Sequence, residues 1–217
     1  MLFLVACGSR SLVSDVFSAV YSDTFNASND ITQTKLNPDY RYLRVEVAGA
    51  NAALLVLGYL DATPQGDVEV WYSSKGEVIK LQNGRIVGTA GLTTDWRRVS
   101  YPIAPPAWTA IPVDGLQFTR VRDESPGYRN AIAQTVQLKP WAGLPSIPLA
   151  ATLPTDVARS YDWYQEVQTG SPERALPPSW FAVDYRDGKR TVIYSEQCLS
   201  VSLCLKLQLW PVEKAKF

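Results

Sequence analysis

Few side chains in this 217-residue chain suit acid–base or nucleophilic catalysis, because the sequence contains no histidine. Histidine is the usual near-neutral acid or base, the partner of a nucleophilic serine or cysteine, and the commonest metal ligand. The three cysteines alone make a poor zinc site, since zinc normally takes four nitrogen or sulfur ligands. Carboxylates remain as candidates, but no sequence feature pairs them as acid and base. The ones considered are Asp61, Glu69, Glu77, Asp95 and Asp184. The sequence therefore predicts no enzyme, no metal and no cofactor.

The first cysteine, Cys7, has a context suited to lipid attachment. Leu4-Val5-Ala6-Cys7 is similar to a bacterial lipobox, in which the thiol is diacylated and the preceding peptide is removed. Two or three acyl chains anchor a protein firmly, because each buried methylene contributes about 0.8 kcal/mol. Residues 1–6 contain no Lys or Arg and are short for a signal peptide, so we expect the natural start to lie upstream. The alternative is that residues 1–6 form a core strand and that Cys7 is a buried thiol.

The residue after Cys7 indicates which membrane would hold the lipid. An aspartate there would resemble an inner-membrane retention signal, but Gly8 occupies the position. We therefore expect an outer-membrane anchor, with the protein facing the periplasm. Residues 1–6 would be the remnant of a signal peptide and 7–11 a tether, and residues 12–217 would form a single, mainly β periplasmic domain.

Cys198 and Cys204 are candidates for a structural disulfide. In one straight strand the two residues would lie about 20 Å apart and could not bond. If the five intervening residues form a loop, the bond closes easily, and the periplasm permits it. With Cys7 assigned to lipid, an even pair of cysteines remains.

Four further residues are candidates for contact with a glycan or a partner protein. Gly84-Arg85 could place a planar guanidinium beside a sugar carboxylate or an acidic group of a partner. The alternative is that Gly84 supplies a positive φ in the turn and that Arg85 is a solvated strand residue or pairs internally. Arg44 points opposite to its neighbours, as an internal ion-pair member or a surface residue. Trp71 and Trp96 could stack on pyranose faces, whereas most large aromatic residues serve cores. Asp95, Arg97 and Arg98 flank Trp96.

The composition restricts the classes of protein further. Lys plus Arg and Asp plus Glu both total 21, and no basic stripe occurs, which argues against a nucleic-acid partner. No apolar run reaches the roughly 18 residues of a membrane-spanning helix. The hydrophobic fraction of 46% and the seven tryptophans are ample for a packed core.

The hydrophobic pattern predicts one helix followed by strands. Residues 12–25 place apolar side chains on one helical face. Segments with strand character follow at 42–47, 52–60, 68–72, 78–81, 85–89, 118–122, 128–138, 161–167, 180–185, 191–194 and 203–210. Asn83-Gly84 is a strong hairpin signal, and residues 203–210 alternate with period two. The fold class is therefore all-β, an antiparallel sandwich or barrel of about ten to twelve short strands with one N-terminal amphipathic helix.

An ordered set of segments resembles one known family, the YjbF/GfcB-type lipoproteins of exopolysaccharide and group 4 capsule operons. The segments are the lipobox with Cys7, Tyr42-Leu43-Arg44, residues 54–60, Trp71, residues 83–89 with Gly91-Leu92, Trp163, residues 180–184 and residues 205–211. The resemblance implies an outer-membrane lipoprotein that faces the periplasm and belongs with other polysaccharide-export components. It supplies no catalytic residues.

Three functions are compatible with these observations. The first is a non-enzymatic accessory in export or assembly of a capsule or exopolysaccharide, with outer-membrane lipid and other envelope proteins as partners. The second is direct polysaccharide binding through exposed tryptophans and Arg85. The third is a polysaccharide hydrolase with two carboxylates. A buried carboxylate pair in a pocket would favour the third, and an exposed aromatic cleft the second.

Overall fold

The computed structural model describes residues 35–48, 50–169, 175–186 and 188–211. The chain divides into two compact units, Met1–Asp39 and Tyr40–Phe217, and the described strands belong to the second. The helix expected at residues 12–25 and the candidate lipidation site Cys7 lie outside the described residues. Within the described ranges, no helix has both the length and the hydropathy needed to cross a bilayer.

The described residues of the second unit form strands and two short helical turns. The strands are β1 (Tyr42–Val47), β2 (Ala53–Asp61), β3 (Val68–Tyr72), β4 (Val78–Gln82), β5 (Arg85–Ala90), β6 (Asp95–Ser100), β7 (Leu116–Ser125), β8 (Arg129–Trp141), β9 (Asp162–Thr169), β10 (Ser179–Arg186), β11 (Lys189–Ser200) and β12 (Leu203–Trp210). The turns are η2 (Trp108–Ala110) and α2 (Thr155–Ala158).

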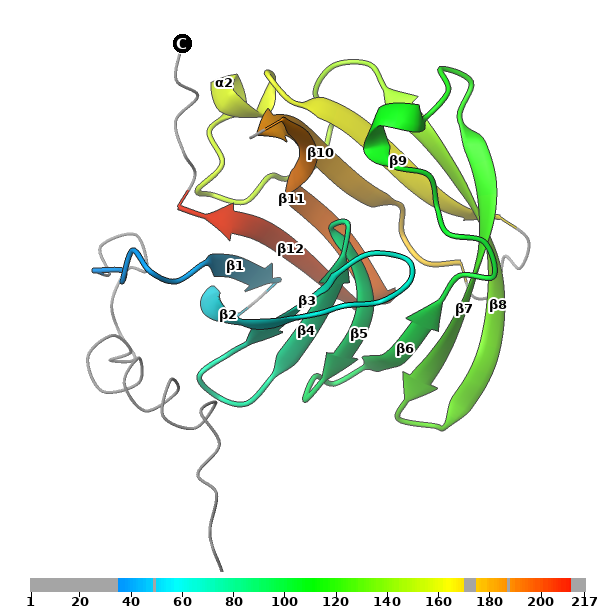
Figure 1. Cartoon of the computed structure of the whole chain (residues 1–217), viewed down its shortest axis with the longest axis horizontal. Helices are drawn as coiled ribbons and strands as arrows, with labels where there is room; N and C mark the ends of the chain where they lie inside the picture. Colours follow the sequence, from blue (N-terminus) through cyan, green and yellow to red (C-terminus); the bar gives the residue numbers. More distant parts are fainter. Residues whose placement is uncertain (1–34, 49, 170–174, 187, 212–217) are drawn as a thin grey trace, which may run out of the picture. The chain divides into compact units, whose positions relative to one another are not determined.

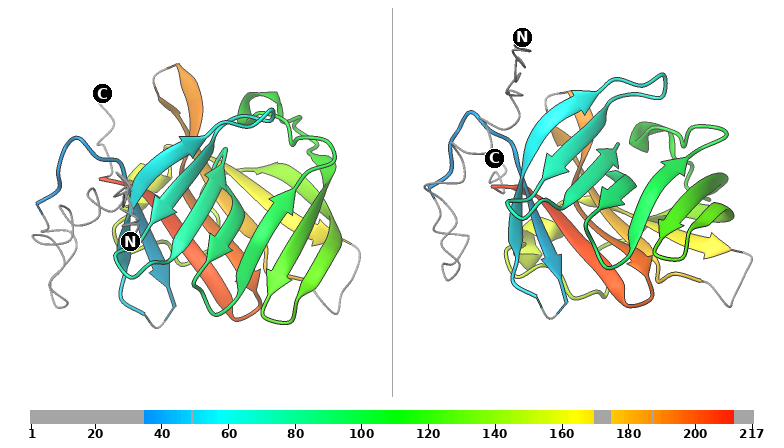
Figure 2. Two further views of the ribbon diagram at one scale, coloured as in Figure 1. Left: turned by 60° about the horizontal axis from the view of Figure 1, so that its bottom comes forward. Right: turned by 90° about the horizontal axis from the view of Figure 1, so that it is seen from below.

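All twelve strands form one antiparallel sheet in the order β5-β4-β3-β2-β1-β12-β11-β10-β9-β8-β7-β6. Every neighbour in this order is also a neighbour in sequence, except that β1 pairs with β12. The sheet curls so that its two edge strands, β5 and β6, lie side by side (Figures 1 and 2). The all-β, antiparallel prediction is confirmed, and of its two alternatives the barrel is the one that forms.

Side chains, rather than a ladder of paired strands, join the two edges. The Oγ1 hydroxyl of Thr89 on β5 donates to Oδ1 of Asp95 on β6 at 2.9 Å. The same hydroxyl oxygen accepts a hydrogen bond from the backbone N–H of Trp96 at 3.0 Å. The barrel is therefore nearly closed, with a seam between β5 and β6.

Alternation along the strands fills the interior and leaves a second cluster outside it. Leu205 and Leu207 on β12 point inward, as the period-two pattern predicts, and join the main core. A separate cluster contains Trp163, Trp180 and Tyr194 together with residues of the β8–β9 connection. That connection therefore covers part of the barrel's outer surface.

The sequence pattern missed one strand, β6. Trp96 and Val99 are both buried although they are three residues apart, an odd spacing that breaks period two. A register shift between Trp96 and Arg98 in the pairing with β7 explains the spacing, because a bulge inserts one extra residue. With charged Arg97 and Arg98 between them, the segment has no visible alternation.

The two ends of the barrel carry different connections, because consecutive antiparallel strands turn alternately at one end and the other. We call the upper end the one that carries the β2–β3, β4–β5, β6–β7, β8–β9 and β10–β11 connections. The lower end carries the remaining ones. In the left panel of Figure 2 the upper end points up. The longest connections, β6–β7 and β8–β9, both belong to the upper end.

Candidate functional site

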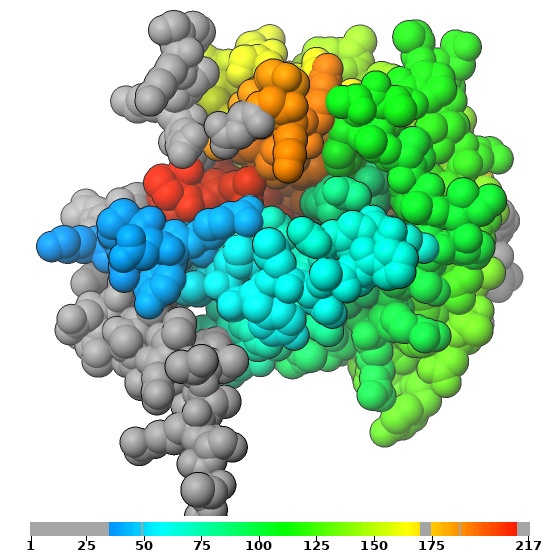
Figure 3. Space-filling model, viewed as in Figure 1, coloured from blue at the N-terminus to red at the C-terminus, as the bar shows by residue number. Residues whose placement is uncertain are grey.

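A pocket of about 410 Å³ opens at the upper end of the barrel. Figure 3 shows this end hollowed between the cyan β2–β3 segment and the orange β10–β11 segment. Its floor is largely aliphatic and comes from β1, β4, β11 and β12, although Thr191 and Ser195 of β11 also line the pocket. The floor residues are Leu43, Leu81, Val192, Ile193, Leu207 and Leu209. The volume falls within the range of sites that bind small molecules.

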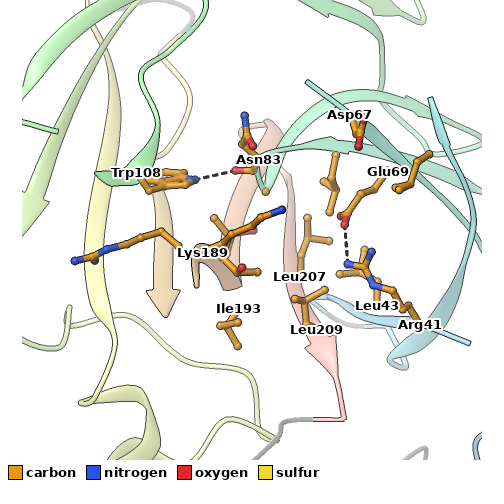
Figure 4. A pocket seen from close by; sticks show the side chains of 17 residues that line it. Arg41, Leu43, Asp67, Glu69, Asn83, Trp108, Lys189, Ile193, Leu207 and Leu209 are labelled. Carbon is orange, nitrogen blue, oxygen red and sulfur yellow. Dashed lines mark hydrogen bonds and ion pairs between the residues drawn. The ribbon is translucent and has the colours of Figure 1, made fainter. Parts of the chain in front are cut away.

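Charged side chains surround the mouth of the pocket (Figure 4). Nη2 of Arg41 donates to Oε1 of Glu69 at 2.7 Å, and Arg190 forms an ion pair with Asp162. Lys189 and Asp67 are exposed and have no ion-pair partner among the described residues. The mouth therefore carries charges of both signs, two of which are available to a ligand.

The β4–β5 turn, Asn83-Gly84, forms one wall of the pocket and packs tightly against β11. A Cβ atom at Gly84 would lie 2.4 Å from Cβ of Val192, and Gly84 has a positive φ of 76°. Two side-chain hydrogen bonds hold the turn. Nε2 of Gln197 donates to the Gly84 carbonyl at 2.9 Å, and Nε1 of Trp108 donates to the Asn83 carbonyl at 3.0 Å.

Trp108 lines the pocket but offers it no open ring face. The guanidinium carbon of Arg85 lies 4.0 Å from the centroid of the indole ring. The rings of Tyr164 and Phe181 lie 5.2 Å and 5.1 Å away, centroid to centroid. Only 5% of Trp108 is exposed. Internal contacts therefore occupy the surfaces on which a pyranose ring would stack.

Arg85 belongs to a charged cluster inside the barrel. Its Nε donates to Oε1 of Glu166 at 2.7 Å, and the two side chains are 5% and 4% exposed. A buried guanidinium and carboxylate require each other, because either one alone would be a buried, uncompensated charge. Arg85 thus links the β4–β5 turn to β9 across the interior.

Two more arginines of the cluster come from β7 and lie against one tryptophan. Nε of Arg120 donates to Oε1 of Gln134 at 2.8 Å, and Arg122 forms an ion pair with Glu124. Their guanidinium carbons lie 4.8 Å and 4.9 Å from the centroid of the Trp96 ring, a cation–π arrangement. The cluster is therefore held by hydrogen bonds, ion pairs and aromatic faces together.

Burial in this cluster changes the acidity of its members. It raises the pKa of the Tyr101 hydroxyl to about 12, although the positive charge of Arg85 acts in the opposite direction. Burial also lowers the pKa of the Arg120 guanidinium, against the effects of Tyr101 and Glu166. Both changes follow from the cost of placing a charge in a medium of low polarity.

The structure places all four candidate contact residues in buried positions. Trp71 and Trp96 are 0% and 2% exposed and belong to the core, while Arg85 pairs with Glu166. Arg44 forms an ion pair with Glu46 and lies 5.9 Å from the Trp210 ring. As folded, these side chains present no surface to a glycan or a partner, and the internal roles that the sequence left open account for their positions.

The two C-terminal cysteines lie opposite each other on neighbouring strands. Cys198 of β11 pairs directly with Cys204 of β12, and the structure joins their sulfur atoms in a disulfide. The strands turn through Val201 and Ser202 between them, so the intervening residues form a hairpin. The bond links the two strands at the lower end, away from the pocket.

Sequence reasoning missed the residues that line the pocket mouth. Arg41, Asp67 and Lys189 belong to three segments far apart in the chain, and none has a local motif. Only the alternation of the connections between the two ends brings them together. Arg120 and Arg122 had a usable signal, because they share one strand face with Phe118, which is buried.

The fold and the site define a class of protein: a twelve-stranded antiparallel barrel with a filled interior and a pocket at its upper end. The chain belongs to the family of group 4 capsule polysaccharide lipoproteins described as GfcB and YjbF, whose model matches residues 14–144. Among solved structures, the crystal structure of the hypothetical lipoprotein YmcC from Escherichia coli K12 has a similar fold, with a TM-score of 0.66 and 20% identity. The match covers 94% of this chain and 98% of that one. The search of curated proteins gave no match.

Proposed function

We infer that this protein is a non-enzymatic accessory in the export or assembly of a capsule or exopolysaccharide. It is anchored in the outer membrane by lipid on Cys7, faces the periplasm, and acts through contacts with other envelope proteins. The observation that carries this proposal is membership of the capsule polysaccharide lipoprotein family. The lipobox-like sequence at Cys7 supports the anchor.

The distribution of exposed apolar side chains supports contact with partner proteins. Tyr59, Leu60, Ile103, Val113, Trp141 and Tyr185 are exposed and lie at the upper end, on its connections or on the strand ends beside them. Tyr128 and Val201 are their counterparts at the lower end. Exposed aromatic residues are enriched at protein–protein interfaces.

The paired state of the carboxylates supports a role without catalysis. Glu166 and Glu124 inside the barrel and Glu69 at the pocket mouth each form an ion pair with an arginine. A glycoside hydrolase needs two carboxyl groups that flank a bound sugar, one of them available as a proton donor. The carboxylates of the interior are instead committed to holding guanidinium groups.

The anchor is tested by the intact mass of protein extracted from membranes of cells that express the gene from its native chromosomal locus. We expect a chain that begins at Cys7 and carries two or three acyl chains. The Cys7→Ser variant should leave the membrane fraction and reduce surface polymer. An unmodified mass that retains Met1, or full surface polymer with Cys7→Ser, would refute the anchored accessory role.

The contact surface is tested by photo-crosslinking in cells that make the polymer. A photoreactive residue at Ile103 or Tyr185 should give discrete crosslinks to envelope proteins. The same residue at Tyr128 or Val201, on the lower end, is the matched control. Equal crosslinking at both ends would mean that the upper end has no special role in contacts.

Direct polysaccharide binding is the second candidate, and Trp141 is the observation that favours it. This residue is 37% exposed, and Nζ of Lys139 lies 5.7 Å from its ring centroid. An exposed indole beside a cation suits an acidic sugar. Purified capsule oligosaccharide should then bind the protein but not the Trp141→Ala variant, and equal binding by both would reject this site.

A further inference from the structure

The chemistry of the pocket differs from that of a sugar site. Its floor is formed mainly by leucine, isoleucine and valine side chains, which bury aliphatic groups and offer no hydrogen bonds to hydroxyls. Thr191 and Ser195 also line the pocket, and the buried Ser195 hydroxyl already accepts a hydrogen bond from Gln197. Trp108, the aromatic residue among the described residues that line it, is covered by Arg85, Tyr164 and Phe181. A saturated chain therefore fits the floor better than a pyranose ring.

The mouth of the pocket adds charge to this aliphatic floor. Lys189 on β11 and Asp67 before β3 both line the pocket and are exposed, and neither forms an ion pair with a described residue. Leu60 lies at the same mouth and is 51% exposed. A ligand that enters past Leu60 would bring its head between a cation and an anion (Figure 4).

We propose that this pocket binds an amphiphile that consists of an aliphatic chain and a zwitterionic head. The chain lies on the floor formed by Leu43, Leu207 and their neighbours. The anionic group of the head faces Lys189, and its cationic group faces Asp67. Phospholipids with a phosphate and an ammonium group have this chemistry, so the site would take a single chain of a membrane lipid or of a related amphiphile.

This proposal goes beyond the accessory role and does not depend on it. Binding is measured on purified protein, whereas the accessory role is measured by surface polymer in cells. If the protein binds the amphiphile but its loss does not change surface polymer, the accessory role is refuted and the proposed binding site stands.

The test uses dodecylphosphocholine below its critical micelle concentration and isothermal titration calorimetry. The protein is the full chain with Cys7→Ser, so that it carries no acyl chains of its own. We expect saturable binding at one site. Phosphocholine, which is the same head without the chain, should bind at least about tenfold more weakly, because the chain supplies the apolar contact.

Two exposed substitutions at the mouth separate specific binding from general surface adsorption. Leu60→Asp should weaken binding by about tenfold or more, since it places a charge where the chain enters. Lys189→Glu should weaken it by about threefold or more, because it repels the phosphate. The matched controls at the lower end are Val201→Asp and Lys75→Glu, which should bind as the parent does. Thermal unfolding confirms that each variant is folded.

Three results would overturn the proposal. The first is the absence of saturable binding below the micelle concentration. The second is equal affinity in Leu60→Asp, Lys189→Glu and their controls. The third is a capsule oligosaccharide that binds, is lost in Lys189→Glu, and is not displaced by dodecylphosphocholine, which would identify a glycan site instead.

Discussion

One side of the barrel interior is aliphatic, and the other carries buried charges. Leucines of β1, β4 and β12 fill the first side, which opens to solvent at the pocket. On the second side, β7 and β9 supply Arg120, Arg122, Glu124 and Glu166, which are all buried. The accessible part of the interior is thus its mainly aliphatic part. In this barrel the buried charges connect strands to one another, whereas the aliphatic side is the one that a ligand can reach.

The charged side depends on the buried ion pair between Arg85 and Glu166, and Arg85→Met tests this. The substitution leaves Glu166 buried without its cation, so we expect a loss of about 3–5 kcal/mol in the free energy of unfolding, measured in urea. Adding Glu166→Gln should recover much of the loss. The control is Arg98→Met, whose side chain is 72% exposed and should change stability by less than about 1 kcal/mol. Equal losses in the two arginine variants would show that the interior pair has no special importance.

The aliphatic side should respond to lost volume rather than to lost partners. Leu205 is 0% exposed, so Leu205→Ala should cost about 2–5 kcal/mol through lost contact and a residual cavity. Leu60→Ala, at the half-exposed mouth, is the control and should cost about 1 kcal/mol or less. Chemical unfolding measures both. A cost below 1 kcal/mol for Leu205→Ala would mean that this side is loosely packed throughout.

Gly84 lies between the two sides and should not tolerate a side chain. Gly84→Ala places Cβ within 2.4 Å of Val192 at a positive φ, so steric overlap and backbone strain together should cost about 2–4 kcal/mol. Gly66→Ala has a positive φ of 105° and no heavy atom within 4 Å. Gly66→Ala therefore measures backbone strain without steric overlap. The difference in melting temperature between the Gly84→Ala and Gly66→Ala variants then measures the effect of the overlap with Val192. Identical melting temperatures would argue against close contact between the β4–β5 turn and β11.

Tyr101 should make the charged side sensitive to alkaline pH. Its pKa of about 12 in the folded protein exceeds its ordinary value of 10.0, so the folded state holds the phenolic proton more tightly. The contribution of the protonated Tyr101 hydroxyl to the free energy of unfolding is complete below pH 10 and is lost as the pH rises towards 12. Tyr101 contributes at most about 1.4 kcal/mol per pH unit to the slope of the unfolding free energy against pH.

The matched pair for this prediction is Tyr101→Phe and Tyr128→Phe. Tyr128 is 80% exposed, so its variant should follow the parent curve of unfolding free energy against pH. Tyr101→Phe should flatten the curve between pH 10 and 12. Parallel curves for the parent and both variants would show that the pKa of Tyr101 is not raised in the folded protein.

The strand pattern could be predicted because it depends on local alternation. Strands β1, β3 and β12 have the predicted bounds, and the Asn83-Gly84 turn is in place. β6 escaped prediction because a bulge at Trp96 breaks the alternation. On β7 both faces carry polar residues, so the alternation gave a weaker signal there, and Phe118 is the residue that indicates the enclosed face of Arg120 and Arg122.

The sequence by itself determined the class of fold, the family resemblance and the candidate anchor at Cys7, because these depend on residue order. Tertiary structure decided that Arg85 and Trp96 are internal, since only the curled sheet shows which faces are enclosed. It also decided the pocket, which joins Arg41, Asp67 and Lys189 across the upper end. Residues so far apart in the chain come together only when the sheet curls into a barrel, and no local sequence pattern predicts this proximity.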